Sequence, residues 1–574
     1  MADDSLWPRV TRPKRQHSLL ALFLALSTLV STAQTQTPTE LFDQVWSIVE
    51  QRFYQEDLKG LDSKQLIEEA HSVLRNVRDP QRAVEIINSY LDRLQASHTQ
   101  LFSGAEPEYY ELLDVFCRGP QRANILALFS GEEPHYTGIL IATKGPLVVD
   151  SVPGGPAALA GFLPGDEILS VEDQAFHPIN SFRDREGQSL KVQVRREQQT
   201  LILTVSPIQI QPRQSFLDSI ELSAKVLPGQ FYNLGYVRMW SYAGEDFHKE
   251  LKRVVRERFQ SVDGLLLDLR GRWGGAQAQY LEIFGAAPRL TLKPRQGEAL
   301  DIPGSFWAKP AAILVDASVT SGKEVLAYGF SKLGLGPLVG ERTAGAVTAG
   351  SLHLLPDRHA LYLATAEVLV DGQSLEGIGV SPSHQAETAT LLTKSVSILE
   401  NETLKKEIKW RANLDQSVRQ NPHLDFSKPR TAEALVKIDR DNTAWAKSLV
   451  QAVGWPGHDL VGEREANLFW LLIQHTSDLE FQGECLELLR VAVKENNASA
   501  TDLAYLEDRY RMLTGRPQIY GTQLKIENGV TRLWTIENPE QVENRRRAAG
   551  LESLQDYLEY WNLHDLPLDQ VMIP

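Results

Sequence analysis

Residues 264–275 read GLLLDLRGRWGG, and residues 311–324 read AAILVDASVTSGKE. Each stretch begins with a continuous apolar run of strand length, which is typical of a strand buried on both faces of a sheet. The first run leads into a loop with Gly274 and Gly275, where the backbone can approach a ligand closely. The second run leads through a turn at Ser321 into a helix. Together the two stretches predict an α/β core.

The surrounding sequence continues this alternation between about residues 235 and 382. Such alternation of short apolar runs with helical stretches favours an α/β domain, whose bounds we place at 211–385. We expect strands at 235–240, 264–269, 311–315 and 337–340, and helices at 247–259 and 323–333.

The regions on either side of this core have different textures. Apolar residues recur at helical spacing in 34–110, which predicts a helical N-terminal region. Residues 120–210 contain short β-rich runs separated by glycine, which predicts a small β domain. Residues 395–574 are charged and predicted to be helical. At about 150 residues per domain, a chain of 574 residues has room for this multidomain α+β organisation.

Composition excludes several classes of protein. The hydrophobic fraction of 42% is too high for a disordered chain. The net charge of −15 provides no field that attracts nucleic acid or an anionic membrane. The chain has two cysteines, Cys117 and Cys485, and this excludes a disulfide scaffold and a cysteine zinc pattern; one long-range bridge stays open.

The first 33 residues have the order of a secretory signal. Basic residues at 9, 12, 14 and 15 precede an apolar run from Leu19 to Val30, and small residues follow at 31–33. The run is shorter than the roughly 20 residues that span a bilayer, so we expect cleavage rather than a permanent anchor, which is the alternative. The mature chain then begins near Gln34 and works in the periplasm or outside the cell.

Position alone does not decide the role of Ser321. A serine hydroxyl at a helix N-terminus benefits from the local positive potential, which stabilises a developing oxyanion. The same serine has an ordinary role as an N-cap that needs no catalysis. The glycines at 274 and 275 likewise have the alternative of forming a tight turn after a buried strand.

Several motifs in order resemble those of the tail-specific, or C-terminal processing, family of serine peptidases and its tricorn-like relatives. These motifs are DLRGRWGG, TSGKE, VGERTAG and LEGIGVSP. The stretch VDSVPGGPAALAGFLPGDEILSVED, residues 149–173, is similar to the PDZ domains of these peptidases. The resemblance covers about residues 41–382. It implies a PDZ-like domain at 120–210 and a crotonase-like catalytic core.

The resemblance assigns roles to residues of the core. Ser321, three residues before Glu324, takes the place of the nucleophile. Gly322, with Gly274 or Gly275, takes the place of the oxyanion-binding donors. Ala346 stands where the branch that uses a Ser-Lys dyad has its lysine. Lys323 is no substitute, because two residues along a helix turn a side chain away by roughly 200°.

A histidine is available as the base instead. The segment RLQASHTQL resembles the element of the histidine-using branch, with His98 as general base and Ala96 in place of the usual acidic residue. In the same branch an acidic residue helps to orient the site, and Glu376 in LEGIGVSP occupies that place. Imidazole accepts a hydroxyl proton near neutral pH, and a carboxylate stabilises the imidazolium. Taken singly, His98 and Glu376 are also explained as a polar helix-end residue and a surface carboxylate.

The PDZ-like resemblance implies a binding site for a peptide tail. Gly138 and Ile139 would form the turn that holds a terminal carboxylate, next to a strand edge that pairs with the peptide. A degenerate domain that only regulates access is the alternative.

The C-terminal region resembles a helical bacterial domain of unknown function, so the resemblance implies no activity there. Its polar side chains either converge on a site or are paired within the helices, and we leave both open. They are His458, Glu463, His475, Asp478, Gln482, Asp508 and Arg509.

The sequence thus predicts an exported serine endopeptidase that acts through an acyl-enzyme on proteins with free C-termini. It predicts no cofactor, no metal, no nucleic acid and no permanent membrane anchor, and it does not indicate the oligomeric state. The alternative is an inactive relative that binds peptides through its PDZ-like domain. The Ala346 substitution is the feature that favours this alternative.

Overall fold

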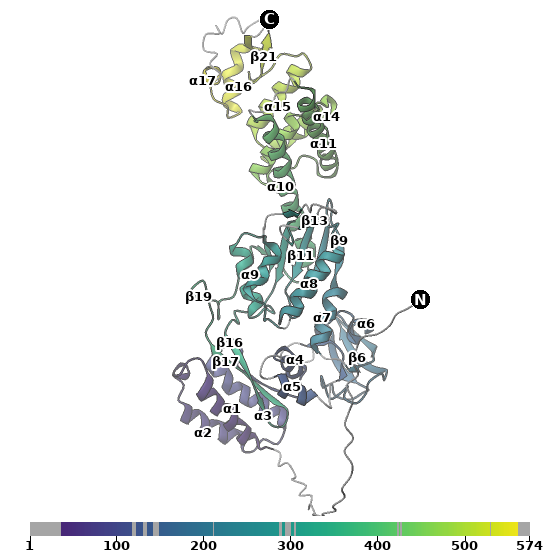
Figure 1. Ribbon diagram of the computed structural model, residues 1–574, viewed down its shortest axis with the longest axis vertical. Coiled ribbons are helices and arrows are strands. Elements are labelled where there is room, and N and C mark those ends of the chain that lie inside the picture. Colours follow the sequence, from purple (N-terminus) through teal and green to yellow (C-terminus); the bar gives the residue numbers. More distant parts are fainter. Residues whose placement is uncertain are drawn as a thin grey trace, which may run out of the picture.

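Helices at both ends of the chain flank a central sheet in the computed structural model (Figure 1). The structure describes residues 36–117, 122–129, 135–141, 148–209, 212–271, 273–285, 290–292, 300–302, 306–421, 424, 428–527 and 530–560. The predicted signal at 1–33 lies outside these residues. In the described part, no helix is both long and apolar enough to cross a membrane.

The N-terminal region is a helical unit, as expected. Its helices are α1 (Pro38–Arg52), α2 (Ser63–Leu74) and α3 (Pro80–Leu91). Side chains cap the starts of all three: Thr37 forms a capping box with Glu40, and Asp62 and Asp79 accept from the first turns of α2 and α3. Their apolar faces form a core of their own around Phe42.

A short strand connects this helical unit to the rest of the molecule. β1 (Gln100–Ser103) pairs antiparallel with β17 (His359–Ala366), which pairs with β16 (Ala349–Leu355). This three-stranded sheet joins segments that are more than 250 residues apart in sequence. Helices α4 (Pro107–Val115) and α5 (Arg122–Phe129) follow β1.

The region predicted to be a small β domain is made of short antiparallel strands around one helix, α6 (Pro156–Ala160). The pairs are β2 (His135–Tyr136) with β8 (Ile208–Gln209), and β3 (Ile139–Ile141) with β4 (Val148–Ser151). A three-stranded sheet contains β5 (Glu167–Val171), β6 (Leu190–Arg196) and β7 (Gln199–Val205). Buried side chains around Phe162 and Phe182 form its core.

The central sheet has six strands in the order β20-β15-β14-β11-β10-β9, all parallel except β9. Their bounds are β9 (Lys225–Pro228), β10 (Asn233–Arg238), β11 (Gly264–Asp268), β14 (Ala311–Val315), β15 (Leu338–Gly340) and β20 (His384–Gln385). The two stretches quoted first form the neighbouring strands β11 and β14, and both strands are buried throughout.

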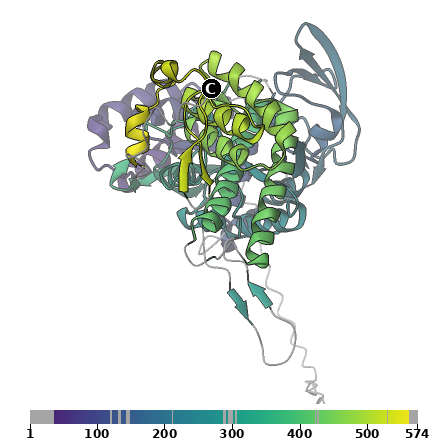
Figure 2. The same ribbon diagram turned by 90° about the horizontal axis from the view of Figure 1, so that it is seen from above.

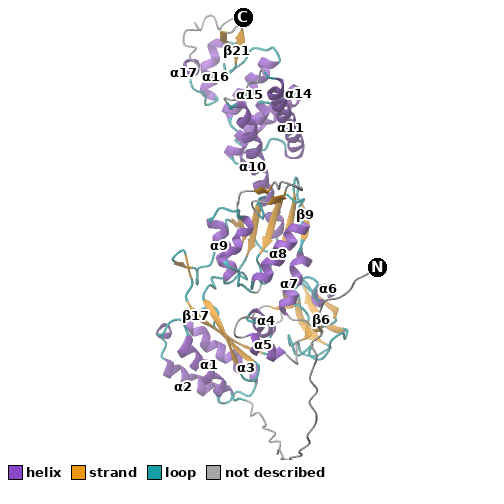
Figure 3. Ribbon diagram, viewed as in Figure 1, coloured by secondary structure: helices purple, strands orange, loops and turns teal. Residues whose placement is uncertain are grey.

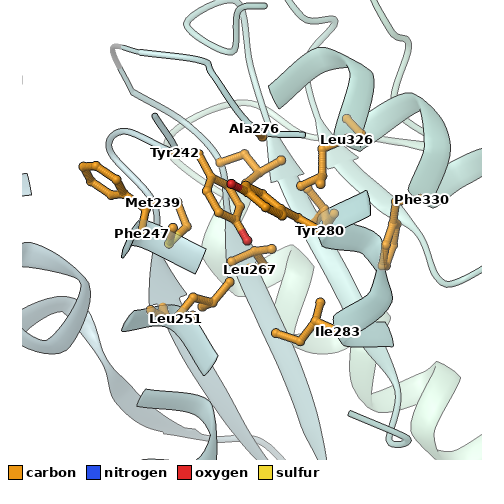
Figure 4. Close-up of a cluster of buried hydrophobic side chains, with 14 of the residues drawn as sticks. Met239, Tyr242, Phe247, Leu251, Leu267, Ala276, Tyr280, Ile283, Leu326 and Phe330 are labelled. Atoms are coloured by element: carbon orange, nitrogen blue, oxygen red, sulfur yellow. The ribbon is translucent and has the colours of Figure 1, made fainter. Parts of the chain in front are cut away.

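Helices cover both faces of this sheet (Figure 3). α7 (Pro212–Ser223), α8 (Glu245–Arg258), the 3-10 helix η4 (Ala278–Phe284) and α9 (Gly322–Lys332) contribute to the larger core. In this core Leu267 of β11 lies among Leu251, Tyr280 and Ile283 (Figure 4). The other face packs against Leu391 and Leu399 of α10 (Leu391–Arg419).

α10 also begins the C-terminal region, so one helix belongs to both units. It packs on β11 and β14 at its start and on α11 (Pro429–Val453) and α13 (Glu463–Gln474) further along. The other helices are α12 (His458–Val461), α14 (Leu479–Lys494), α15 (Ala500–Leu513), α16 (Val542–Ala548) and α17 (Leu554–Tyr560). A hairpin, β21 (Leu524–Glu527) with β22 (Val530–Leu533), interrupts a region expected to be helical.

Viewed from above, the N-terminal helices (purple) and the small β region (blue) lie on opposite sides of the C-terminal helices (Figure 2). The predicted mixed α/β organisation, with helical regions at both ends, is confirmed. The finer assignments, a PDZ-like domain and a crotonase-like core, stay predictions.

Candidate active site

Ser321 stands at the N-cap position of α9 in a backbone conformation that few serines adopt. Its φ is 56° and its ψ is −131°, and its side chain makes no capping hydrogen bond. Strain of this kind in a residue other than glycine persists only where the surrounding structure enforces it, as at functional sites. The hydroxyl of Ser321 is therefore not used as a cap.

The glycine loop after β11 lies against Ser321. A β-carbon on Gly274 would come within 2.5 Å of Ser321 Cβ and 3.1 Å of Gly322 N. One on Gly322 would come within 2.2 Å of the Ala276 carbonyl oxygen. Only glycine permits this approach of the two backbones. Among the described residues, no hydrogen bond uses the N–H of Gly274, Gly275 or Gly322.

Glu324 fixes a second loop beside Ser321. Its buried carboxylate accepts from Thr343 Oγ1 (2.5 Å), Gly345 N (2.7 Å) and Ala346 N (2.7 Å). The Ala346 carbonyl in turn accepts from Ser321 N at 2.7 Å. Burial raises the pKa of Glu324, against the effect of these hydrogen bonds. The motif glutamate thus holds the loop that supports the serine backbone.

His98 is oriented by a backbone carbonyl. Its Nδ1 lies 2.6 Å from the Thr348 carbonyl oxygen, and its ring packs against Tyr362 with centroids 4.9 Å apart. Because a carbonyl only accepts, Nδ1 carries the proton and Nε2 keeps its lone pair. Burial lowers the pKa of His98, while the Thr348 carbonyl and the Glu376 charge oppose this. His98 is therefore neutral at ordinary pH and has the tautomer of a base.

Glu376 reaches His98 through intermediates. Its carboxylate accepts from Ser97 N (2.7 Å) and Ser97 Oγ (2.8 Å), and from Val347 N (2.7 Å) and Thr348 N (3.1 Å). It forms no hydrogen bond with His98 among the contacts of the described residues. Burial raises the pKa of Glu376, but these hydrogen bonds outweigh it and the pKa is lowered, so the group is ionised. Glu376 holds the two segments that hold the imidazole.

Lys323 follows the serine and points elsewhere. It is fully buried, and Nζ donates to the carbonyls of Trp240 (3.0 Å), Leu269 (3.0 Å) and Gly271 (3.3 Å). Burial, and then the Arg238 charge, lowers the pKa of Lys323 to about 7. The contacts place this amine behind the glycine loop rather than beside the Ser321 hydroxyl, in agreement with the helical-spacing argument.

A buried ion pair supports the same loop. Asp268 is fully buried and accepts from Tyr236 OH (2.8 Å) and Arg270 Nη2 (2.7 Å). Burial raises the pKa of Asp268, but the charges of Arg270 and Arg238 bring it below its usual value. Arg238 also pairs with Asp150 of β4 at 2.6 Å. The loop base is thereby joined to the small β region.

A cavity of about 1360 Å³ brings these groups together. Its lining includes Ser321, His98, Gly274 and Gly275, together with Ala346. The N-terminal helical unit, the core and the small β region all contribute to the lining, including Phe102, Trp273, Phe176 and His177. Gly138 and Ile139 are not among the described residues that line it.

The structure thus places Ser321, His98 and the glycine pair in one cavity, with Gly322 next to Ser321 and Glu376 behind His98. No hydrogen bond joins Ser321 to His98 among those of the described residues. Sequence reasoning missed Ser97 and Thr348. Ser97 is adjacent to His98 and carries a hydroxyl, which was a usable signal. Thr348 acts through its main-chain carbonyl, so its side-chain type gave none.

Three family models match parts of this chain. Residues 233–386 match the model of Peptidase family S41, residues 34–92 match the Tricorn protease C1 domain, and residues 402–565 match a family of unknown function. Residues 233–386 therefore resemble the S41 peptidases, and the resemblance to C-terminal processing peptidases and their tricorn-like relatives is confirmed. The PDZ resemblance stays a prediction.

Two curated relatives are named as C-terminal processing peptidases. The chain is 25% identical over 304 residues to carboxyl-terminal-processing peptidase 2, chloroplastic, of Arabidopsis thaliana, with 47% of this chain and 57% of that one covered. It is 23% identical over 255 residues to the carboxy-terminal processing protease CtpB of Bacillus subtilis (strain 168), with 41% and 52% covered. The chain therefore spans little more than half the length of these relatives.

Among solved structures, a photosystem II D1 C-terminal processing protease matches with a TM-score of 0.38 and 20% identity, covering 62% of this chain and 94% of that chain. A TM-score of this size does not establish a common fold by itself.

In the part of the chain that the structure describes, no three His, Cys, Asp or Glu side chains are grouped to hold a metal ion.

Proposed function

We propose that the protein is a serine endopeptidase in which Ser321 attacks the peptide carbonyl and His98 accepts its proton. The observation that carries this proposal is Ser321, whose backbone is strained and whose hydroxyl makes no capping hydrogen bond. It shares one cavity with the His98 imidazole, whose Nε2 keeps its lone pair and can act as a base. A nucleophile and a base that face one substrate space are the basic requirement for acyl transfer.

The proton moves from the Ser321 hydroxyl to His98 Nε2 as the hydroxyl oxygen bonds to the carbonyl carbon. The imidazolium then returns this proton to the leaving amine, and an acyl-enzyme remains. Water, activated by the same imidazole, hydrolyses the ester. Thr348 O and Glu376 favour the imidazolium, the first by its hydrogen bond and the second by its charge.

The backbone around the serine provides donors for the oxyanion. Gly322 N lies at the start of α9, where main-chain N–H groups have no partner inside the helix. Gly274 and Gly275 of the glycine loop line the same cavity, and their N–H groups are the other donors that we propose. Fixed donors that face a developing negative charge lower the barrier by roughly 3 kcal/mol each.

The small β region gives this peptidase a place for a substrate tail. β3 begins next to Gly138, whose φ of 73° turns the chain ahead of the strand. A free C-terminal carboxylate at this turn, with the tail added to the β3 edge, is the recognition that we propose. We also propose export, on the signal-like order of residues 9–33.

A serine-directed fluorophosphonate probe tests the activity directly. The full chain should be labelled once, at Ser321, as mapped by mass spectrometry. Ser318→Ala is a matched control that keeps Ser321 and removes a neighbouring hydroxyl that bonds Gly271 N. An unlabelled Ser321 in folded protein would favour the inactive peptide-binding alternative.

A further inference from the structure

The C-terminal region contains a polar cluster that the peptidase chemistry does not use. It lies within residues 402–565, where α10, α11, α13 and α15 meet. Asp415 is fully buried and accepts from His475 Nδ1 at 2.8 Å and from Arg419 Nε at 2.9 Å. Arg419 also bonds Asp439 of α11. Both carboxylates therefore already have cationic partners inside the protein.

Arg509 of α15 adds a cation that pairs with no carboxylate among the described residues. Its Nε is shielded from solvent and has no hydrogen-bond partner among the described residues. Asn467 of α13 donates to Asp502 of α15, and Trp470 packs against Tyr505, so these helices run side by side in the same direction and Arg509 lies level with the end of α13 at His475. Burial, and then the charge of Arg419, lowers the pKa of Arg509. By contrast Arg490 and Arg511, on the neighbouring turns of α14 and α15, both pair with Glu507. Arg509 as a whole is partly exposed, but a desolvated guanidinium nitrogen without a partner is costly unless an anion meets it.

The other unpaired buried atoms around the cluster are mainly donors. Asn442 Nδ2, one turn from Asp439 on α11, and Gln474 Nε2, next to His475, have no partner in the described part of the chain. Gln482 Oε1 is the one acceptor in this group. His475 uses Nδ1 on Asp415, and its side chain is 19% exposed. A surplus of unpaired donors favours an anionic ligand over a metal ion or a cation.

We propose that this cluster is a binding site for a small oxyanion, either a phosphate group or a carboxylate group. Arg509 is its principal cation, and Arg419 and His475 lie beside it. Asp415 and Asp439 position Arg419 and His475 rather than contact the ligand. Of the polar residues singled out in the sequence, Asp478 and Asp508 take no part, because Asp478 caps α14 and Asp508 holds the turn at 519–522.

Equilibrium dialysis of the full chain with radiolabelled inorganic phosphate, and separately with radiolabelled acetate, tests this site. Ionic strength is held constant with chloride. We expect saturable binding of one equivalent of anion per chain. The anion that binds more tightly shows whether the site takes a phosphate group or a carboxylate group. Arg509→Gln should weaken it by about tenfold or more, since a charge-assisted contact is lost. Arg490→Gln, which removes an ion-paired arginine of the same domain, should bind as the wild type does.

A measurement without substitution keeps the proposal falsifiable if Arg509→Gln does not fold. Phenylglyoxal modifies arginines, and the preferred anion at saturation should protect Arg509 from it, as mapped by mass spectrometry. Exposed Arg256 should be modified equally with and without the anion. Absence of saturable binding of both anions, or no protection of Arg509, would overturn the site. None of these readouts depends on peptidase activity.

Discussion

At the scale of the residue, the proposed mechanism makes the activation of Ser321 depend on the protonation state of His98. His98 must be neutral to accept the proton, and burial holds its pKa below the usual 6.5. Activity is therefore lost as the pH falls through this lowered value, and it is retained above it. We expect the rate of fluorophosphonate labelling to show a single acid limb with an apparent pKa below 6.5.

Substitutions test whether Ser321 and His98 cause this acid limb of the pH profile. His98→Ala and Ser321→Ala should each remove most turnover, and the double variant should be little worse than either, because the two residues act as a unit. Near-normal turnover in folded His98→Ala would contradict the assignment.

Lys323 gives a second prediction at the same scale, on stability. The pKa of Lys323 is about 7 in the folded chain, against 10.5 for a free lysine, which represents the unfolded chain. Between these two pH values the lysine is protonated in the unfolded chain and neutral in the folded one. Stability therefore rises with pH across this window, by up to several kcal/mol. In Lys323→Met this rise should disappear, as measured by thermal unfolding between pH 7 and 10.

Lys332→Met is the control, since Lys332 lies on the same helix but is half exposed and pairs with Asp371. The Lys332→Met variant should keep the rise in stability. An equal pH dependence in wild type and Lys323→Met would show that the buried amine does not titrate in this range.

At the scale of the element, the loops that hold the imidazole depend on one carboxylate. Glu376→Gln removes a charge that raises the pKa of His98 and leaves one acceptor oxygen for four donors. We expect labelling to slow by about tenfold and its acid limb to move to lower pH. Exposed Glu367→Gln should change neither. A limb that stays in place, or moves upward, would mean that Glu376 does not act on His98.

The elements of the core were predictable because their local sequence agrees with their surroundings. The strand expected at 311–315 is β14 to the residue, and the helix expected at 323–333 is α9, one residue earlier. Long apolar runs between glycines carry that information locally. The β16–β17 hairpin was not predicted. Gly350, Ser351 and His353 interrupt the apolar pattern of β16, and β17 pairs with β1 from a distant part of the chain, which local sequence does not indicate.

The site was predictable where side-chain types carry the chemistry, as for Ser321 and His98. It was not predictable where a main-chain atom does the work. Thr348 binds His98 through its carbonyl across 250 residues of sequence, and no residue type indicates this contact. The indirect position of Glu376 has the same origin, because its partners are mostly main-chain N–H groups.

At the scale of the whole molecule, the proposed catalytic pair comes from two distant parts of the chain. His98 precedes β1, and pairing of β1 with β17 carries it to the core that holds Ser321. Residues of the small β region also line the cavity that Ser321 and His98 share. This is the region that we propose to bind the substrate tail. The Asp150–Arg238 pair joins that region to the loop base.

Export is a prediction about the chain as a whole. Protein recovered from its native cell should begin near Gln34, as determined by N-terminal sequencing, because the signal-like segment ends at residue 33. Chains that retain Met1 or Ala2 in the cytoplasm would contradict export.

Tail recognition is tested on the full chain with Ser321→Ala, which prevents cleavage during the measurement. A peptide with a free C-terminal carboxylate should bind more tightly than its C-terminal amide, by about tenfold, since amidation removes the charge that backbone donors would hold. Fluorescence anisotropy measures both affinities. Gly138→Val should reduce binding of the free acid, because a β-branched residue resists a φ of 73°. Gly187→Val serves as the control, since Gly187 has a φ of 69° on the same region but an open surface and no place beside β3. Equal binding of acid and amide would leave the small β region as a spacer between the N-terminal helices and the core, and substrate choice would then depend on the cavity alone.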